Sequence, residues 1–256
     1  MKTEFNQHTV IVTGGTQGLG RGISECFLAA GAEVIVAARR APNHPVEMDS
    51  RRAHFCECDV RDPEASQALI DFALEKTGRL DVLINNAGGS PEVAAASASP
   101  RLTRSVIDLN LVAPAVLSQQ AHLAIERTTG TGSIINIASV SATRPSPGTA
   151  AYGAAKAGLV NLTRSLAQEW APAIRVNVII AGLARTENSE AHYGGAQGIT
   201  RIERRLPMKR MATPKDIGKA CLFLASAEAA YISGTTLEVH GGGEPPAFLS
   251  LQRDDD

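Results

Sequence analysis

The stretch TVIVTGGTQGLGRGI, residues 9–23, decides the fold of this 256-residue chain. Its first five residues are all β-branched, which predicts a strand over 9–13, and a helical pattern near 19–30 follows. Gly14, Gly18 and Gly20 lie between the two. Glycine permits a sharp turn and lets backbone amides approach a pyrophosphate, while a helix N-terminus offers unpaired N–H groups. We therefore expect a nucleotide-binding turn here, with a purely structural turn as the alternative.

The end of the next predicted strand bears on which dinucleotide would bind. It reads VIVAARR, so that Ala38 is followed by Arg39 and Arg40. Many dinucleotide sites carry an acid at about 20 residues past the glycines, where it holds the ribose 2′-hydroxyl. An arginine instead binds a 2′-phosphate through charge-assisted hydrogen bonds. The pair favours NADP(H) as cofactor and leaves NAD(H) possible; two solvated arginines at the start of a loop are the alternative.

The rest of the chain alternates short apolar strands with longer helical patterns. We expect strands at 9–13, 33–38, 53–58, 81–85, 133–138, 174–180 and 236–239, and helices near 19–30, 62–76, 102–127, 150–171 and 214–226. This alternation predicts an α/β fold, a doubly wound parallel sheet with helices on both faces. Two stretches break the rhythm, 88–100 and 183–214. Loops after strand carboxyl ends line the ligand crevice of such a sheet, so we expect both on the substrate side.

Composition narrows the classes of function. The net charge of −1 gives no electrostatic reason to expect a nucleic-acid partner, and no apolar run approaches the ~20 residues that span a bilayer. The four cysteines form no CxxC pair and the six histidines no HExxH-like cluster, so we expect buried thiols and no metal site. The N-terminus has no signal-peptide pattern. We therefore expect a cytoplasmic protein that binds neither nucleic acid nor membrane.

A second stretch, YGAAK at 152–156, suggests catalysis. In a helix, Tyr152 and Lys156 would lie one turn apart on the same face. A neighbouring ammonium favours the phenolate and so lowers the pKa of a tyrosine from its ordinary value of about 10. The pair thus predicts a tuned acid/base, with a surface Tyr/Lys pair on an ordinary helix as the alternative. The three residues between them are small, and we expect bulk there to crowd a cofactor.

Together these residues resemble the short-chain dehydrogenase/reductase family, in its compact type with TGxxxGxG and YxxxK motifs. The matching stretches, in the family's order and spacing, are TGGTQGLG (13–20), Asp59-Val60, NNAG (85–88), Asn110, Ser139, YGAAK, LPMKRMATPKDIGKACLFLAS (206–226) and YISGTTLEVHGGG (231–243). The resemblance implies a single Rossmann-like domain over 1–256 with seven parallel strands, a substrate loop at about 183–214 and a C-terminal tail at about 244–256. Members of the family are often tetramers or dimers, so it also implies a homotetramer or homodimer.

The resemblance assigns the catalytic set Asn110, Ser139, Tyr152 and Lys156. Tyr152 would exchange a proton with the substrate oxygen and Ser139 would hydrogen-bond that oxygen. Lys156 would also hold the nicotinamide ribose, and Asn110 would position a water. An ordinary strand-end hydroxyl for Ser139 and a mid-helix polar residue for Asn110 are the alternatives. The implied cofactor contacts are Gly14, Thr16, Gln17, Gly18, Leu19, Gly20, Arg39, Arg40, Asp59, Val60, Asn86, Ala87, Gly88, Tyr152, Lys156, Gly182 and Thr186.

Two departures from the family pattern concern loops near the C-terminal strands. Ala181-Gly182 stands where the family usually has Pro-Gly, which removes a fixed φ and would loosen that loop. His240 begins the run His-Gly-Gly where the family often has Asp-Gly-Gly. We expect altered contacts at this end and unaltered chemistry.

The expected function is hydride transfer between NADP(H) and a secondary alcohol or ketone, and the substrate hypotheses come from two groups of residues. Cations in the second irregular stretch suggest an anionic carrier such as a 3-oxoacyl thioester, or else a solvated helix face; they are Arg185, Arg201, Arg204, Arg205, Lys209 and Arg210. A small-residue wall of Ala94, Ala95, Ala96 and Ala98 suggests an alicyclic or steroid-like ketone. The alternative function is an NADP-binding sensor or regulatory protein without turnover. Phe248 and Leu249 would partly order the tail, or the tail is free.

Overall fold

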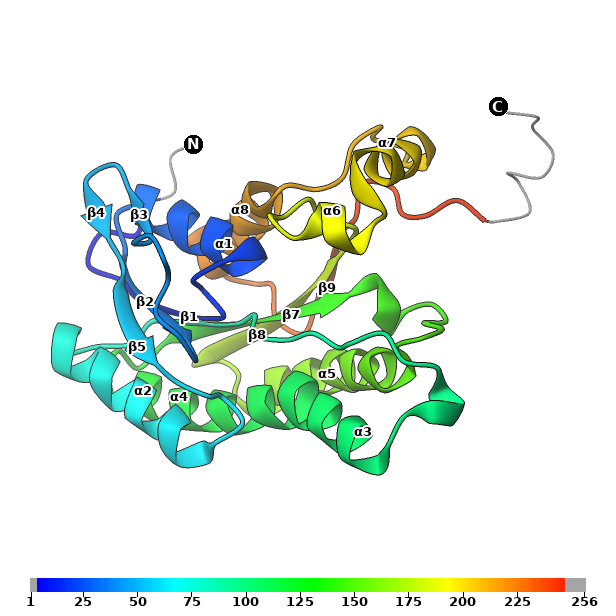
Figure 1. Cartoon of the computed structure of the whole chain (residues 1–256). Coiled ribbons are helices and arrows are strands. Elements are labelled where there is room, and N and C mark those ends of the chain that lie inside the picture. The colour runs from blue at the N-terminus through cyan, green and yellow to red at the C-terminus, as the bar shows by residue number, and fades with distance from the viewer. Residues whose placement is uncertain (1–3, 247–256) are drawn as a thin grey trace.

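A seven-stranded parallel sheet forms the centre of the molecule, in a computed structural model that describes residues 4–246 (Figure 1). The strand order is β5-β2-β1-β6-β7-β8-β9, so the direction of winding reverses between β1 and β6. The strands are β1 (Thr9–Thr13), β2 (Glu33–Ala38), β5 (His54–Glu57), β6 (Val82–Asn85), β7 (Gly132–Ser139), β8 (Ile174–Ala181) and β9 (Thr236–Val239). The predicted doubly wound sheet of seven strands is confirmed.

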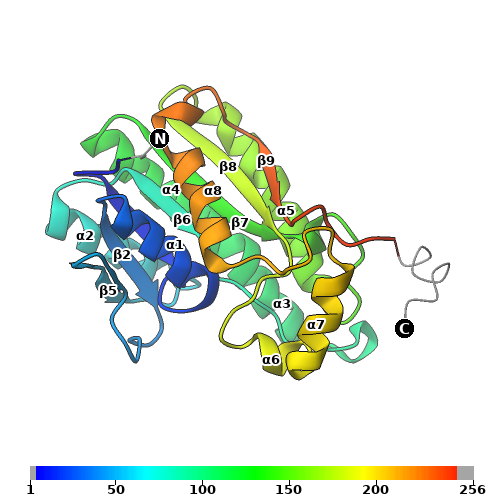
Figure 2. The ribbon, with the colours of Figure 1, turned by 90° about the horizontal axis from the view of Figure 1, so that it is seen from above.

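Helices cover both faces of the sheet (Figures 1 and 2). One layer consists of α1 (Gly18–Ala29) and α8 (Pro214–Ala225), and the other contains α2 (Pro63–Thr77), α4 (Ala113–Thr128) and α5 (Ala150–Glu169). Alternate residues of one strand face the two layers: Val10 and Val12 belong to the first apolar core, and Ile11 to the second. Because both faces are buried at the centre of the sheet, β1 and β2 contain runs of consecutive buried apolar residues.

The structure corrects the predicted helix over 102–127. Two α-helices occupy this stretch, α3 (Pro100–Ile107) and α4, and a π-helical turn at Asp108–Val112 joins them. A π turn shifts the hydrogen bonds to i→i+5 without changing the apolar pattern enough to be seen in the sequence. A short antiparallel ribbon of β3 (Glu47–Met48) and β4 (Arg51–Arg52) was also not predicted, since its four residues show no apolar alternation.

The irregular stretch 183–214 begins at the carboxyl end of β8 and contains α6 (Ser189–His192) and α7 (Gly195–Arg205). A small apolar cluster of Ile199, Leu206 and Met211 holds it together, apart from the two main cores. None of the helices within 4–246 is long and apolar enough to cross a membrane. The predicted contacts of Phe248 and Leu249 lie outside the described residues.

Candidate active site

The glycine turn follows β1 at the carboxyl edge of the sheet. Gly14 and Gly18 have φ angles of 63° and 54°, in the left-handed region that favours glycine. A Cβ at Gly20 would lie 2.1 Å from the carbonyl oxygen of Gly14, so no side chain fits there. The turn is tied to β2 by the N–H of Gly14, which donates to the Ala37 carbonyl at 2.7 Å. A tight backbone turn at the start of α1 fits a phosphate group.

The NNAG motif holds this turn from β6. Asn86 Nδ2 donates to the carbonyl oxygens of Thr13 at 2.8 Å and Gly14 at 3.3 Å. In return, Thr13 Oγ1 accepts from the backbone N–H groups of Asn86 and Ala87 at 2.9 and 3.0 Å. The side chain of Asn86 therefore shapes the turn, and the structure brings Asn86 and Ala87 directly against it.

The first turn of α1 contacts the irregular stretch. Gln17 is the exposed N-cap residue and makes no side-chain cap, while Leu19 packs partly buried against the first core. Thr16, between the glycines, is partly exposed. A Cβ at Gly18 would lie 3.7 Å from Thr186 Cγ2, so Thr186 lies over the turn as a cofactor contact would require.

Charged residues gather at the ends of β2 and β5. Arg39 and Arg40 are exposed there, with Val60 buried beside them in the second core. Asp59 forms an ion pair with Arg61 at 2.5 Å. Hydrogen bonding from Arg61 is the largest cause that holds the pKa of Asp59 below its ordinary value, and the charge of Arg39 contributes in the same direction. Arg39 is thus electrostatically close to Asp59, one of the implied cofactor contacts.

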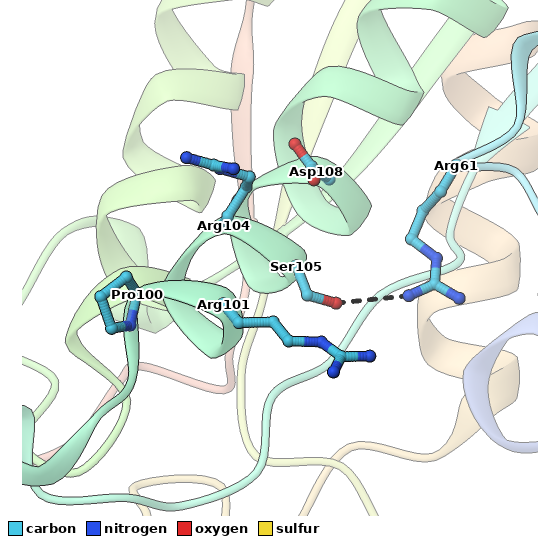
Figure 3. Close-up of a pocket in the computed structure, with 6 residues that line it drawn as sticks. All are labelled: Arg61, Pro100, Arg101, Arg104, Ser105 and Asp108. Carbon is cyan, nitrogen blue, oxygen red and sulfur yellow. Dashed lines mark hydrogen bonds between the residues drawn. The ribbon is translucent and has the colours of Figure 1, made fainter.

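A hollow of about 310 Å³ adjoins this edge (Figure 3). It is lined by Arg61, Pro100, Arg101, Arg104, Ser105 and Asp108. Arg61 Nη1 donates to Ser105 Oγ at 3.3 Å, and the Arg104 side chain points away from Arg61. None of the predicted catalytic residues lines this hollow. Sequence reasoning missed Arg61, although its place two residues after Asp59 could have drawn attention to it.

Asn110 lies in the π-helical turn and is completely buried. Its Nδ2 donates to the carbonyls of Val106 and Gly89, both at 2.9 Å, and its Oδ1 accepts from the Gly89 N–H at 3.0 Å. The bond to Val106, four residues earlier, is what a mid-helix polar residue without a catalytic role would also make. The two bonds to Gly89 go further, because they tie the turn to the loop that follows β6.

Lys156 lies on α5 with 3% of its surface exposed. Its Nζ donates to the Ile137 carbonyl at 2.7 Å, and burial lowers the pKa of Lys156 to about 8. A Cβ at Gly88 would lie 3.2 Å from Lys156 Nζ and 2.7 Å from Asn110 Oδ1. The structure therefore brings two predicted catalytic residues together around Gly88.

Tyr152 lies one helical turn before Lys156, whose Nζ is 5.7 Å from the centroid of the Tyr152 ring. Burial raises the pKa of Tyr152, a hydrogen bond with Ser139 opposes that rise, and the nearby Tyr193 adds to it. The predicted direction, a pKa lowered by Lys156, is therefore wrong for this structure, because loss of hydration dominates. Ser139 ends β7 and also accepts from the Ser141 N–H at 3.2 Å.

Gly153, the first of the small residues in YGAAK, lies against the protein's own backbone; that bulk in this stretch would crowd a cofactor stays a prediction. A Cβ at Gly153 would lie 2.9 Å from the Ser141 carbonyl oxygen. A side chain at Gly153 would therefore clash with the turn that follows β7, two residues after Ser139. Ala155 is buried and Ala154 is exposed.

The two departures at the C-terminal strands have local consequences. Ala181 stays in register with Ser139 on one side and Val239 on the other, so the end of β8 is firmly paired. Gly182 is required by close approach, since a Cβ there would lie 2.6 Å from His240 Cα. The His240 ring is 2.6 Å from a carboxylate oxygen of Glu238 and makes a surface contact.

The cations and alanines on which the two substrate hypotheses rest are mostly at the surface. Arg210 pairs with Asp216 at 2.7 Å, and Lys209 Nζ donates to the Arg204 carbonyl at 2.7 Å, so these two cations have structural partners. Three of the four alanines are exposed, Ala94, Ala95 and Ala96. Ala98 lines a second hollow, of about 420 Å³, together with residues of α3.

A buried polar ladder beneath the site was missed from the sequence. Asn85 Nδ2 donates to Ser118 Oγ at 2.9 Å and to Asn136 Oδ1 at 2.8 Å, and Asn136 Nδ2 donates to Thr163 Oγ1 at 2.8 Å. It joins β6 and β7 to α4 and to α5, the helix that carries Tyr152 and Lys156. The polar Asn136 in the middle of the apolar run SIINIA could have indicated a buried hydrogen-bonded group.

Comparison with known proteins agrees with this geometry. A family model described as enoyl-(acyl carrier protein) reductase matches residues 14–244. The chain belongs to the short-chain dehydrogenase/reductase family. It is an oxidoreductase of the alcohol dehydrogenase/ketoreductase kind, and the fold of the family binds NAD or NADP. Within residues 4–246, no three His, Cys, Asp or Glu side chains are grouped to hold a metal ion.

Three relatives illustrate the range of the family. An uncharacterized oxidoreductase of Mycobacterium tuberculosis is 33% identical, over 93% of this chain and 92% of its own. The 3β-hydroxysteroid dehydrogenase 1 of Eggerthella lenta is 34% identical, over 94% and 95%. A solved structure of the actinorhodin polyketide ketoreductase with NADPH has a TM-score of 0.84 and 28% identity, over 92% of this chain and 96% of that one.

Proposed function

We propose that this protein reduces a ketone, or oxidises the corresponding secondary alcohol, with NADP(H) as cofactor. The observation that carries the proposal is the grouping of Asn110 and Lys156 around Gly88, beside the hydrogen-bonded pair of Tyr152 and Ser139. The nicotinamide supplies or accepts the hydride when the cofactor is bound. The glycine turn at the start of α1 would hold its diphosphate.

The residues of the site have distinct roles in this proposal. Tyr152 donates a proton to the carbonyl oxygen; the phenol is protonated near neutral pH at the ordinary pKa of tyrosine, about 10, and burial, which raises that pKa, leaves it so. Ser139 hydrogen-bonds the same oxygen, where negative charge develops. Lys156 holds the nicotinamide ribose. Asn110 keeps the π turn against Gly89 and positions a water.

The preference for NADP(H) rests on Arg39, which is exposed at the end of β2 and electrostatically close to Asp59. The NADPH in the actinorhodin ketoreductase structure is consistent with it. We expect a lower Michaelis constant for NADPH than for NADH, and Arg39→Asp to shift the preference toward NADH through repulsion of the 2′-phosphate. Steady-state kinetics with both cofactors test this; equal constants for the wild type would remove the argument.

The ketone is open to two proposals, a 3-oxoacyl thioester and an alicyclic or steroid-like ketone. The polyketide ketoreductase supports the thioester, and the steroid dehydrogenase supports the alicyclic or steroid-like ketone. NADPH oxidation across a panel of 3-oxoacyl-CoA esters and cyclic ketones separates them, and activity confined to simple sugars would refute both. NADPH binding without turnover on any of these carbonyls would favour the alternative, a cofactor sensor.

The proposed assembly is a homotetramer or homodimer. Large apolar side chains are exposed on both helical layers, Leu123 on α4 at 65% and Phe223 on α8 at 43%, and Tyr231 is fully exposed after α8. Light scattering after size-exclusion chromatography measures the mass directly. A cytoplasmic location stays a prediction.

A further inference from the structure

The side chain of Glu187 reaches from the irregular stretch to the glycine turn. Its Oε1 accepts a hydrogen bond from the Gly18 N–H at 2.8 Å, although the two residues are 169 positions apart. Gly18 is the first residue of α1, and the first N–H groups of a helix have no partner inside it. The N-cap Gln17 provides no side-chain bond, and the first turn of α1 contains no acidic residue. Glu187 therefore places a negative charge at the positive end of the helix.

We propose that Glu187 competes with the cofactor diphosphate for the N-terminus of α1, and so links cofactor binding to the position of residues 187–195. The inference rests on the proposed function, because it takes the glycine turn as the dinucleotide site. Carboxylate and diphosphate are both anions and repel each other at hydrogen-bonding distance. Entry of the dinucleotide therefore displaces Glu187 from Gly18.

The chain before Glu187 is held in place. The Ala212 N–H donates to the Leu183 carbonyl at 2.9 Å, and the Arg185 N–H donates to the Ala212 carbonyl at 2.8 Å. Residue 212 comes just before α8, which packs in the same layer as α1. The displacement of Glu187 is consequently directed toward α6 rather than back toward β8.

The chain after Glu187 leads to the catalytic tyrosine. Ser189 begins α6 and its Oγ accepts from the Thr186 N–H at 2.7 Å. Tyr193 is the C-cap residue of α6 and lies close enough to Tyr152 to raise the pKa of that residue. Gly194 follows as the N-cap of α7 and Gly195 as its first residue, with φ angles of 76° and 72°. A shift of Glu187 thus reaches the surroundings of Tyr152 through four helical residues.

The direction in which cofactor affinity changes on removal of Glu187 distinguishes competition from a role in which Glu187 holds the bound cofactor. If Glu187 closed over a bound diphosphate, its removal would weaken cofactor binding. Competition predicts the reverse, because the fraction of protein with a free helix N-terminus rises when the carboxylate is removed. The repulsion between two anions at one helix terminus favours competition.

Calorimetric titration with NADPH tests the proposal on the wild type, Glu187→Gln and Glu187→Ala. The matched control is Glu190→Gln, an exposed carboxylate three residues along the same segment. We expect both Glu187 variants to bind NADPH about two- to fivefold more tightly, the range of a charge at an exposed helix terminus, and the control to match the wild type. Adenosine 2′-monophosphate lacks a diphosphate, so its affinity should be the same for all four proteins.

Hydrogen–deuterium exchange gives a second readout. NADPH should increase exchange in residues 187–195 of the wild type, whereas Glu187→Ala should show the raised exchange before NADPH is added. Equal or weaker NADPH binding by the Glu187 variants would overturn the competition while leaving the proposed function intact. Absence of NADPH and NADH binding in all four proteins would remove the proposed function, and the inference with it. Unchanged affinity for adenosine 2′-monophosphate shows that a variant is folded.

Discussion

Lys156→Met should be more stable than the wild type at neutral pH and less stable than the wild type at alkaline pH. In the wild type, burial lowers the pKa of Lys156 from 10.5 to about 8. That difference corresponds to about 3 kcal/mol of cost for burying the charged amine. Methionine removes this cost and also the hydrogen bond to the Ile137 carbonyl, which is worth about 1 kcal/mol. At pH 7 we therefore expect the variant to be more stable by about 2 kcal/mol.

The direction of the pH dependence follows from which state holds the proton. The pKa of Lys156 in the folded state, about 8, lies below its ordinary value of 10.5, which the unfolded chain retains. Between these values the unfolded state binds more protons, so stability rises with pH. By pH 10.5 the free energy of unfolding of the wild type has risen by about 3 kcal/mol, and it then exceeds that of the variant by about 1 kcal/mol.

Urea denaturation of both proteins between pH 7 and 10.5 measures this difference. Other groups that titrate in the window, including the buried thiol of Cys58, are common to both and cancel in the comparison. Lys219→Met, at an exposed position on α8, is the matched control and should track the wild type at every pH. If the free-energy difference between wild type and Lys156→Met changed by less than ~0.5 kcal/mol over this range, the buried-charge argument would be refuted.

Three further predictions concern the site and its support. Tyr152→Phe should lose at least ~100-fold in turnover while its NADPH affinity is retained, because it lacks the proton donor; near-normal steady-state turnover would exclude the role. Gly20→Ala should destabilise the protein by at least ~2 kcal/mol, since the added methyl would lie 2.1 Å from the Gly14 oxygen; an unchanged melting temperature would contradict the turn geometry. Asn136→Ala should cost about 2 kcal/mol in urea denaturation by leaving the Asn85 amide short of a buried partner, and a smaller loss than ~0.5 kcal/mol would show that the ladder is not a stabilising network.

The order of elements could be predicted because it depends on local patterns. Consecutive apolar residues such as Val34, Ile35 and Val36 require cover on both faces, and this suffices to predict a parallel sheet between helices. The glycine turn could be placed for a similar reason, since a strand, glycines and a helix follow one another within 9–30. The π turn at Asn110 could not, because α and π hydrogen bonding differ by one residue within the same apolar pattern.

The sequence by itself determined the seven strands, the glycine turn and the spacing that puts Tyr152 one turn before Lys156. Only the tertiary structure decided how those two side chains are solvated. Burial depends on residues far along the chain, and here it raises the pKa of Tyr152 and lowers that of Lys156. The contact of Glu187 with Gly18 was likewise decided by folding, because it joins residues 169 positions apart that no local pattern connects.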